Sequence, residues 1–309
     1  MQQLTDEIRE IARKLLRDKK VEVVIGYERG SLPLRRRPCF ARKAEDADRL
    51  VWDGWCDNAL ATYLPKRKEK AAIVAKGCDS RAVVELIKEK QVRRDQVVII
   101  GVPCRGMFNR AQLEESVDSA RIARGGESPD FEEALRSEGL LLDCCKTCTH
   151  ANPVLHDVLV GELSPEKTQD PFADLEAFNA MKPEERWAYL SKEVEKCIRC
   201  YGCRNACPLC YCPECFVDAS IPQWIGKSVD VSDTMIFHLM RAYHLAGRCV
   251  ACGACERACP MGVDIGKLNR MLLKEVKELF GYEAGLDLEE KSPLATFRPD
   301  DPESFIVNP

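Results

Sequence analysis

Cysteine is the residue type that points most directly to chemistry in this chain, because of how it is spaced. The chain holds 18 cysteines among 309 residues. Eleven of them fall between Cys197 and Cys259, a density that accidental or buried thiols do not explain. Two runs share the pattern C-x2-C-x2-C-x3-C-P. Their members are Cys197, Cys200, Cys203 and Cys207 in the first run, and Cys249, Cys252, Cys255 and Cys259 in the second.

The spacing of each run suits a [4Fe–4S] cluster. Two intervening residues let a tight loop wrap three thiolates around one cluster, and the fourth cysteine, followed by proline, ligates the other cluster in a two-cluster ferredoxin. Zinc is the alternative, because CxxC pairs also build zinc sites, but two matched runs with trailing proline favour iron. We predict one cluster on Cys197, Cys200, Cys203 and Cys259, and the other on Cys249, Cys252, Cys255 and Cys207.

Three more cysteines, Cys210, Cys212 and Cys215, follow the first run directly. As a CxCxxC triplet they lack one ligand for another [4Fe–4S] cluster. Three possibilities stay open: an N-terminal cysteine completes the set, the triplet binds something else, or its thiols are a reserve. Between the two runs lie His238 and His244. We expect them to pack or to hydrogen-bond near a cluster, because both runs already supply four ligands.

The N-terminal half alternates β-rich apolar runs with helical segments. We expect strands at 21–25, 71–75 and 96–100, and a helix from the KGCDSR turn to about residue 89. Strand, helix and strand over such a short stretch form a βαβ unit. The sequence therefore predicts an α/β domain with an at least partly parallel sheet.

The KGCDSR turn is a candidate anion site. Gly77 permits a sharp strand-to-helix turn, and Asp79 or Ser80 can cap the helix that follows. Main-chain N–H groups beside Lys76 and Arg81 suit a flavin phosphate or a nucleotide pyrophosphate. An ordinary capped helix with surface charges is the alternative. No GxGxxG fingerprint follows a strand, so a standard Rossmann dinucleotide site is not supported.

A further set of thiols belongs to this half. Cys144, Cys145 and Cys148 resemble half a metal site, and Cys104 follows the third expected strand. These four could hold a cluster of their own. The competitors for a place in that set are Cys39, Cys56 and Cys78.

These motifs together resemble a known family. The segments VVIGYERG, AKGCDSRAVVELI, IIGVPC and DCCKTCTHANPVLHDVLVGE, in this order over about residues 20–162, look like the beta subunits of coenzyme F420-dependent hydrogenases and formate dehydrogenases. The run CIRCYGCRNACPLCYCPECF is similar to the two-cluster ferredoxin domains fused to this domain beside formate dehydrogenases and heterodisulfide reductases.

The resemblance implies an oxidoreductase subunit with FAD or FMN and at least one [4Fe–4S] cluster in its N-terminal domain. Cys104 matches the cysteine of the family's GxPC motif, and Cys145 and Cys148 match its CxxC, with Cys144 as the candidate fourth ligand. The chain would pass electrons between a hydride carrier or redox protein and the catalytic and electron-transfer subunits of a formate dehydrogenase, hydrogenase or heterodisulfide-reductase complex in anaerobic metabolism. The alternative is a flavin-free ferredoxin-type wire with no substrate site.

The expected organisation has four parts: an α/β domain at 1–165, a linker at 166–190, a mainly helical two-cluster domain at 191–280, and an extended acidic tail at 281–309. The formal net charge of -4 gives no indication of nucleic acid as a partner. No apolar stretch approaches the roughly 20 residues of a membrane span. The amphipathic N-terminal segment lacks the apolar core of a signal peptide, so we expect a cytoplasmic protein.

Overall fold

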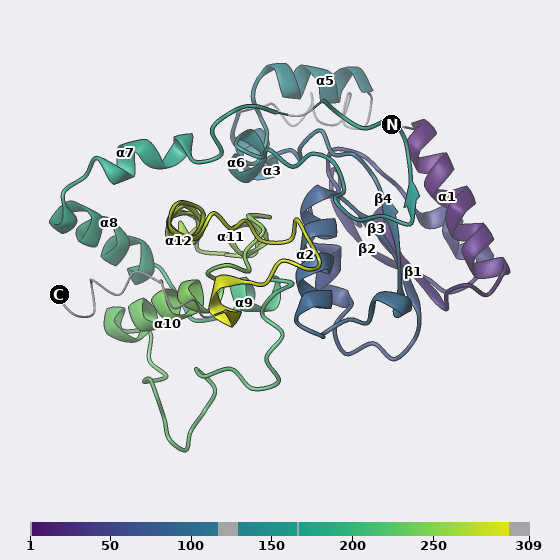
Figure 1. Cartoon of the computed structure of the whole chain (residues 1–309). Helices are drawn as coiled ribbons and strands as arrows, with labels where there is room; N and C mark the ends of the chain where they lie inside the picture. Colours follow the sequence, from purple (N-terminus) through teal and green to yellow (C-terminus); the bar gives the residue numbers. More distant parts are fainter. Residues whose placement is uncertain (1, 117–128, 166, 297–309) are drawn as a thin grey trace.

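A five-stranded mixed sheet and a group of helices around two cysteine loops make up the structure (Figure 1). The computed structural model describes residues 2–116, 129–165 and 167–296. The strand order is β2-β1-β3-β4-β5. The strands are β1 (Val23–Arg29), β2 (Arg36–Ala41), β3 (Ala71–Ala75), β4 (Val97–Gly101) and β5 (Val158–Leu159).

The predicted βαβ unit is present as β3, α2 (Gly77–Lys88) and β4. β3 and β4 are parallel, with Ala71 opposite Val97 and Ala75 opposite Gly101. β1 also runs parallel to β3, and β5 to β4, while β2 is antiparallel to β1. Every residue of β3 is buried, as in a strand that is covered on both faces. The expectation of an α/β architecture with a partly parallel sheet is confirmed.

The edge strand β2 is not among the strands expected from the sequence. In the structure, Arg36 forms an ion pair with Asp53 at 2.6 Å and Arg37 one with Glu28 at 2.8 Å. The positive charges at this edge are therefore neutralised within the fold, and charged side chains also discourage an edge strand from pairing with another chain.

Helices lie on both sides of the sheet (Figure 1). The expected amphipathic N-terminal helix is α1 (Gln2–Arg17), which buries Ile8, Ala12, Leu15 and Leu16. On the other side, α2 lies between the sheet and the C-terminal helices, so its first turn faces the cysteine loops (Figure 1). The remaining helices of this half are α3 (Arg110–Ser116), α5 (Pro129–Ser137) and α6 (Asp143–Lys146).

The C-terminal half is helical. Its α-helices are α7 (Glu176–Asn179), α8 (Pro183–Glu195), α9 (Gly202–Asn205), α10 (Val231–His244), α11 (Ala254–Arg257) and α12 (Ile265–Phe280). The single-turn helices α9 and α11 lie inside the two cysteine loops and contact each other, and α10 packs on both α8 and α12. Helix α10 lies between the two cysteine runs and starts after its N-cap residue Asp230. Short 3-10 segments are Ala44–Arg49, Leu60–Tyr63, Arg94–Gln96, Ala173–Leu175 and Pro293–Ala295.

Two connecting segments pack on the rest of the fold. Of the expected 166–190 linker, the described residues carry helical segments from Ala173 onward, and the guanidinium of Arg270 donates to the Asp174 carboxylate at 3.0 Å. After α12, the segment expected to be an extended tail instead packs on α2: Tyr282 and Ala284 are buried, and Arg81 donates to the Ala284 oxygen at 2.9 Å. The rest of that tail, residues 297–309, lies outside the described residues. None of the helices in the described part combines the length and apolar character that crossing a membrane requires.

Candidate metal centres

The first set of thiols takes three members from the first run and one from the second. Cys197, Cys200, Cys203 and Cys259 line one cavity, which Phe237, His238 and Ile265 close from the side. Burial raises the pKa of Cys197 and of Cys203, and the nearby charge of Cys259 adds to the shift in each case. The cysteine that ends the second run therefore lies with the first loop, which is the crossed arrangement that the sequence predicts.

The second set mirrors the first. Burial raises the pKa of Cys249, Cys252 and Cys255 to about 12 in each case, and the charge of Cys207 adds to all three shifts. A raised pKa keeps these buried thiols protonated, because a buried thiolate needs a compensating positive charge. Iron supplies that charge, so the donor set fits a cluster.

The two loops share one backbone conformation. The left-handed residues are Arg199 (φ 51°) and Tyr201 (φ 59°) in the first loop, and Ala251 (φ 54°) and Gly253 (φ 65°) in the second. In the first loop the N–H of Arg199 points at the Sγ of Cys197, at 3.4 Å, and the N–H of Ala251 bonds to Cys249 in the same way. N–H groups aimed at sulfur stabilise thiolates, so both loops suit thiolate ligation of iron.

A central cavity collects the N-terminal thiols beside the second set. It holds about 1130 Å³ of empty space, including the part open to solvent. Burial raises the pKa of Cys104 to about 12, with the charges of Cys145 and Cys148 adding to the shift. Cys78, in the first turn of α2, lines the same cavity and is electrostatically coupled to both Cys104 and Cys252.

Cys144 also lines the central cavity, and its thiol contacts that of Cys145. Its Sγ lies 3.7 Å from the main-chain oxygen of Cys252 and 3.8 Å from a guanidinium nitrogen of Arg257. A Cβ on Gly253 would stand only 2.5 Å from this sulfur. Cys144 therefore packs against the second cysteine loop as well, so both Cys78 and Cys144 are candidates for the fourth thiol of this set.

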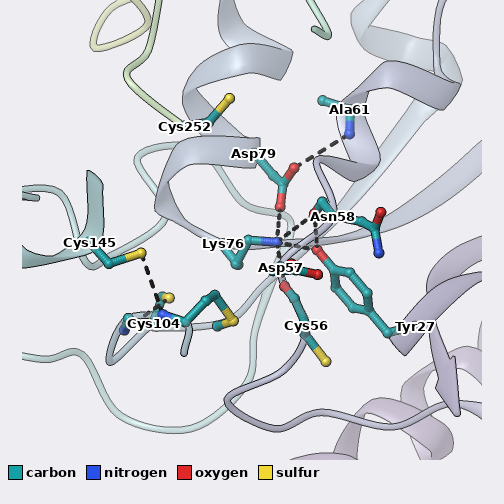
Figure 2. Close-up of polar contacts among 12 residues, drawn as sticks. Tyr27, Cys56, Asp57, Asn58, Ala61, Lys76, Asp79, Cys104, Cys145 and Cys252 are labelled. Carbon is teal, nitrogen blue, oxygen red and sulfur yellow. Dashed lines mark hydrogen bonds and ion pairs between the residues drawn. The ribbon is translucent and has the colours of Figure 1, made fainter. Parts of the chain in front are cut away.

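The predicted anion site at the KGCDSR turn has its polar groups engaged by the protein. The Lys76 ammonium lies 2.8 Å from the Asp79 carboxylate and donates to the Asn58 oxygen at 2.9 Å, to the Cys56 oxygen at 3.0 Å and to the Tyr27 hydroxyl (Figure 2). This buried ion pair fastens the start of α2 to the sheet. Figure 2 also shows Cys104 and Cys145 on one side of this network and Cys252 on another.

The rest of the turn is equally committed. Ser80 donates to the Leu155 oxygen at 2.8 Å, and Arg81 bonds to the Ala284 oxygen and lies 3.2 Å from Glu283. At Gly77, a Cβ would meet the His150 oxygen at 2.1 Å, so the 150–152 segment covers the start of the helix. These residues do not fit a flavin phosphate at this turn, because its charges and its approach are already taken.

Comparisons with known proteins bear on the two cysteine runs and on the longer chain. A family model described as a 4Fe-4S dicluster domain matches residues 193–263. The beta subunit of F420-dependent formate dehydrogenase from Methanocaldococcus jannaschii is 25% identical over 89% of this chain and 90% of its own length. The beta subunit of F420-dependent formate dehydrogenase 1 from Methanococcus maripaludis is 25% identical over 91% of each chain.

Over 89–91% of its length, the chain is similar to the beta subunits of F420-dependent formate dehydrogenases. The resemblance noted from the motifs is thereby confirmed. Among solved structures, a chain of the F420-reducing [NiFe] hydrogenase complex from Methanosarcina barkeri is similar at 15% identity, with a TM-score of 0.31. That similarity covers 40% of this chain and 43% of the hydrogenase chain.

One residue beside the cysteine loops that sequence reasoning missed is Arg241 of α10. It is buried, donates to the Cys203 oxygen at 3.1 Å, and its Nε has no hydrogen-bond partner among the described residues. Burial works against its charge, but the thiolates of Cys255, Cys207 and Cys210 outweigh this and raise the pKa of Arg241. A permanent cation therefore stands between the two ferredoxin-type sets.

Arg257 and His238 complete the surroundings. Arg257, at the end of α11, donates to the Cys252 oxygen at 2.8 Å and to the Asp57 oxygen at 2.6 Å. Burial lowers the pKa of His238 to about 4, and neither of its ring nitrogens has a hydrogen-bond partner within the described ranges. Its ring lines the first cavity, as the sequence analysis expected of a histidine near a cluster. The position of His238 between the two cysteine runs pointed to it in the sequence, whereas no motif marks Arg241 or Arg257.

Proposed function

We propose that this chain is an iron–sulfur electron-transfer subunit of an anaerobic oxidoreductase complex. Its ligands would be Cys197, Cys200, Cys203 and Cys259 for one [4Fe–4S] cluster, Cys249, Cys252, Cys255 and Cys207 for the second, and Cys78, Cys104, Cys145 and Cys148 for a third. Cubane clusters bound by four thiolates accept and release one electron at a time.

The observation that carries the proposal is the continuity of the thiol sets. Arg241 stands against thiols of both ferredoxin-type sets. Cys249 and Cys252 of the second set line the same cavity as Cys78 and Cys104 of the N-terminal set. The three sets therefore follow one another from α10 to the edge of the sheet. An electron path between two partner proteins requires such a series of neighbouring sites.

The remaining residues position and screen the ligands. Main-chain N–H groups bond to ligand sulfurs, among them those of Gly106 on Cys104 and Met107 on Cys145, both at 3.4 Å. The buried Lys76 network fixes the start of α2, and with it Cys78. The buried apolar side chains of Phe237 and Ile265 line the first cavity. Closely packed surroundings keep the ligands in one geometry as charge moves.

The relatives indicate the kind of complex. Both curated relatives are named as beta subunits of F420-dependent formate dehydrogenases. We infer a catalytic partner of the formate dehydrogenase type, with the deazaflavin F420 as a candidate hydride carrier. FAD or FMN stays a prediction that rests on the family resemblance alone. Because the KGCDSR turn does not fit a flavin phosphate, a flavin-free wire between two redox proteins is the second candidate function.

Anaerobic purification of the native complex tests the proposal. Iron, acid-labile sulfide and flavin are measured per chain, and reduced F420 is then offered as electron donor. At least about twelve irons, four from each of three clusters, are expected, together with bleaching of cluster absorbance. Full iron without flavin, and no response to reduced F420, would favour the flavin-free electron wire. Only traces of iron, with zinc in its place, would exclude both candidate functions.

A further inference from the structure

The triplet Cys210, Cys212 and Cys215 has no part in the proposed wire. It lies directly behind Cys207 and Pro208, where the chain leaves the first loop. All three cysteines line one surface cavity with about 1220 Å³ of empty space, including the part open to solvent. This cavity is separate from the cavity of the first set and from the central cavity.

The thiols of the triplet are gathered rather than scattered. Cys210 contacts the thiol of Cys207 and interacts electrostatically with Cys215. Cys212 is exposed, and Cys215 half-buried, so the group opens from the second set toward the surface. Cys207 lines this cavity too, and its charge also reaches Cys249 and Cys252. The proposed function uses Cys207 for the second cluster, which leaves three thiols here and one missing ligand.

The missing ligand has a candidate in the same cavity. His244, on the last turn of α10, lines it, and its ring stands edge-on to Phe216 with centroids 5.3 Å apart. Imidazole nitrogen is an accepted ligand of iron in iron–sulfur centres, where it replaces thiolate. Of the two histidines between the runs, His238 lies at the first cavity and His244 at the triplet.

The charges around the cavity suit an anionic group. Arg204 binds both the Cys215 thiol and the Asp218 carboxylate, the latter at 2.7 Å. Arg241 and Arg248 also line the cavity, and Arg248 is paired with Glu89 at 2.5 Å. A thiolate-ligated cluster carries net negative charge, which such guanidinium groups stabilise.

We propose that Cys210, Cys212, Cys215 and His244 bind a further [4Fe–4S] cluster at the protein surface. The contact between Cys210 and Cys207 places it next to the second cluster of the proposed function, on which this inference rests. The added cluster gives the wire an exposed end at which a partner redox protein exchanges single electrons. A three-cysteine, one-histidine set is also a zinc set, so metal identity is part of the test.

The test compares the full-length holoprotein with Cys212→Ser, Cys215→Ser, His244→Ala and His244→Cys, all made anaerobically. Iron, sulfide and zinc are measured, and EPR spectra of the reduced protein are recorded. Each cysteine variant should lose about four irons, and the cluster EPR of the two ferredoxin-type sets should persist. His244→Ala should lose iron as well, whereas His244→Cys, which restores a four-thiolate set, should keep it.

The matched control is Cys39→Ser, since Cys39 is buried in β2 and lines none of these cavities. It should lose no iron. The readout is the iron content of each variant relative to the unmodified protein. If the proposed N-terminal cluster does not exist, the total iron of the unmodified protein is lower, but this difference is unchanged. Unchanged iron in Cys215→Ser, or the loss of one zinc in place of four irons, overturns the proposal. Unchanged iron in His244→Ala overturns the assignment of the histidine.

Discussion

The guanidinium of Arg257 reaches from the second cysteine loop to the main-chain oxygen of Asp57, at 2.6 Å. Arg257 ends α11, and Asp57 lies between β2 and β3 of the sheet-containing half. The same guanidinium also holds the oxygen of Cys252 at 2.8 Å. One buried side chain therefore ties the second cluster loop to the half of the chain that carries Cys78 and Cys104.

Arg257→Lys should weaken this tie without removing its charge. A lysine cannot bond to both oxygens in the forked geometry, and a lost charged hydrogen bond costs about 1.5–3 kcal/mol. We expect the melting temperature to fall by roughly 3–6 °C, measured by anaerobic calorimetry. Arg93→Lys is the control, because Arg93 pairs with Asp95 at the surface and should shift stability by no more than about 0.5 kcal/mol. Equal melting of the two variants would contradict this role for Arg257.

Arg241→Met should lower the reduction potentials of both ferredoxin-type clusters. A positive charge favours the reduced, more negative state; at roughly 8 Å and an effective dielectric constant of about 20 it contributes about 2 kcal/mol, or about 90 mV for one electron. EPR-monitored redox titration measures both midpoints. Tyr243→Ala offers a comparison on the same helix, because Tyr243 is exposed, and it should leave these two midpoints nearly in place. Unshifted potentials in Arg241→Met, with iron intact, would show that the charge is compensated elsewhere.

Cys78→Ser and Cys144→Ser should differ in iron content. If Cys78 is the fourth N-terminal ligand, its loss removes about four irons, whereas loss of Cys144 leaves the total unchanged. Cys104→Ser serves as the positive control, since Cys104 lies with Cys145 and Cys148. Iron analysis and sulfide assay decide the matter. The reverse pattern would restore Cys144 as the ligand that the motif suggested.

Gly253→Ala should destabilise the second loop more than an equivalent change elsewhere. Gly253 has a φ of +65°, and its new Cβ would stand 2.5 Å from the Cys144 sulfur. Gly262→Ala is the matched control, because Gly262 has a φ of +59° with nothing within 4 Å. Both variants bear left-handed strain of about 1 kcal/mol, and crowding should add about 1 kcal/mol or more at Gly253 alone. Chemical denaturation measures the difference, and a vanishing difference would mean that Cys144 moves aside freely.

The sequence predicted those features that depend on local spacing. The paired runs fixed which cysteines group together, and the alternation of apolar segments gave β3, α2 and β4 nearly to the residue. It could not show that Lys76 binds the Tyr27 hydroxyl and the Asn58 oxygen, because those contacts join segments far apart in the chain. The same holds for Cys78 and Cys144, whose roles depend on how the second loop meets α2. The edge strand β2 escaped notice because its arginines look solvated until Glu28 and Asp53 are placed beside them.

Crossed ligation is the central claim, and double variants test it most directly. Cys200→Ser with Cys259→Ser should lose no more iron than either change alone, about four per chain, because both residues serve one cluster. Cys200→Ser with Cys207→Ser should lose about eight, because these residues serve different clusters although they share a run. The opposite result, with four irons lost from the pair within one run and eight from the pair across runs, would contradict the account.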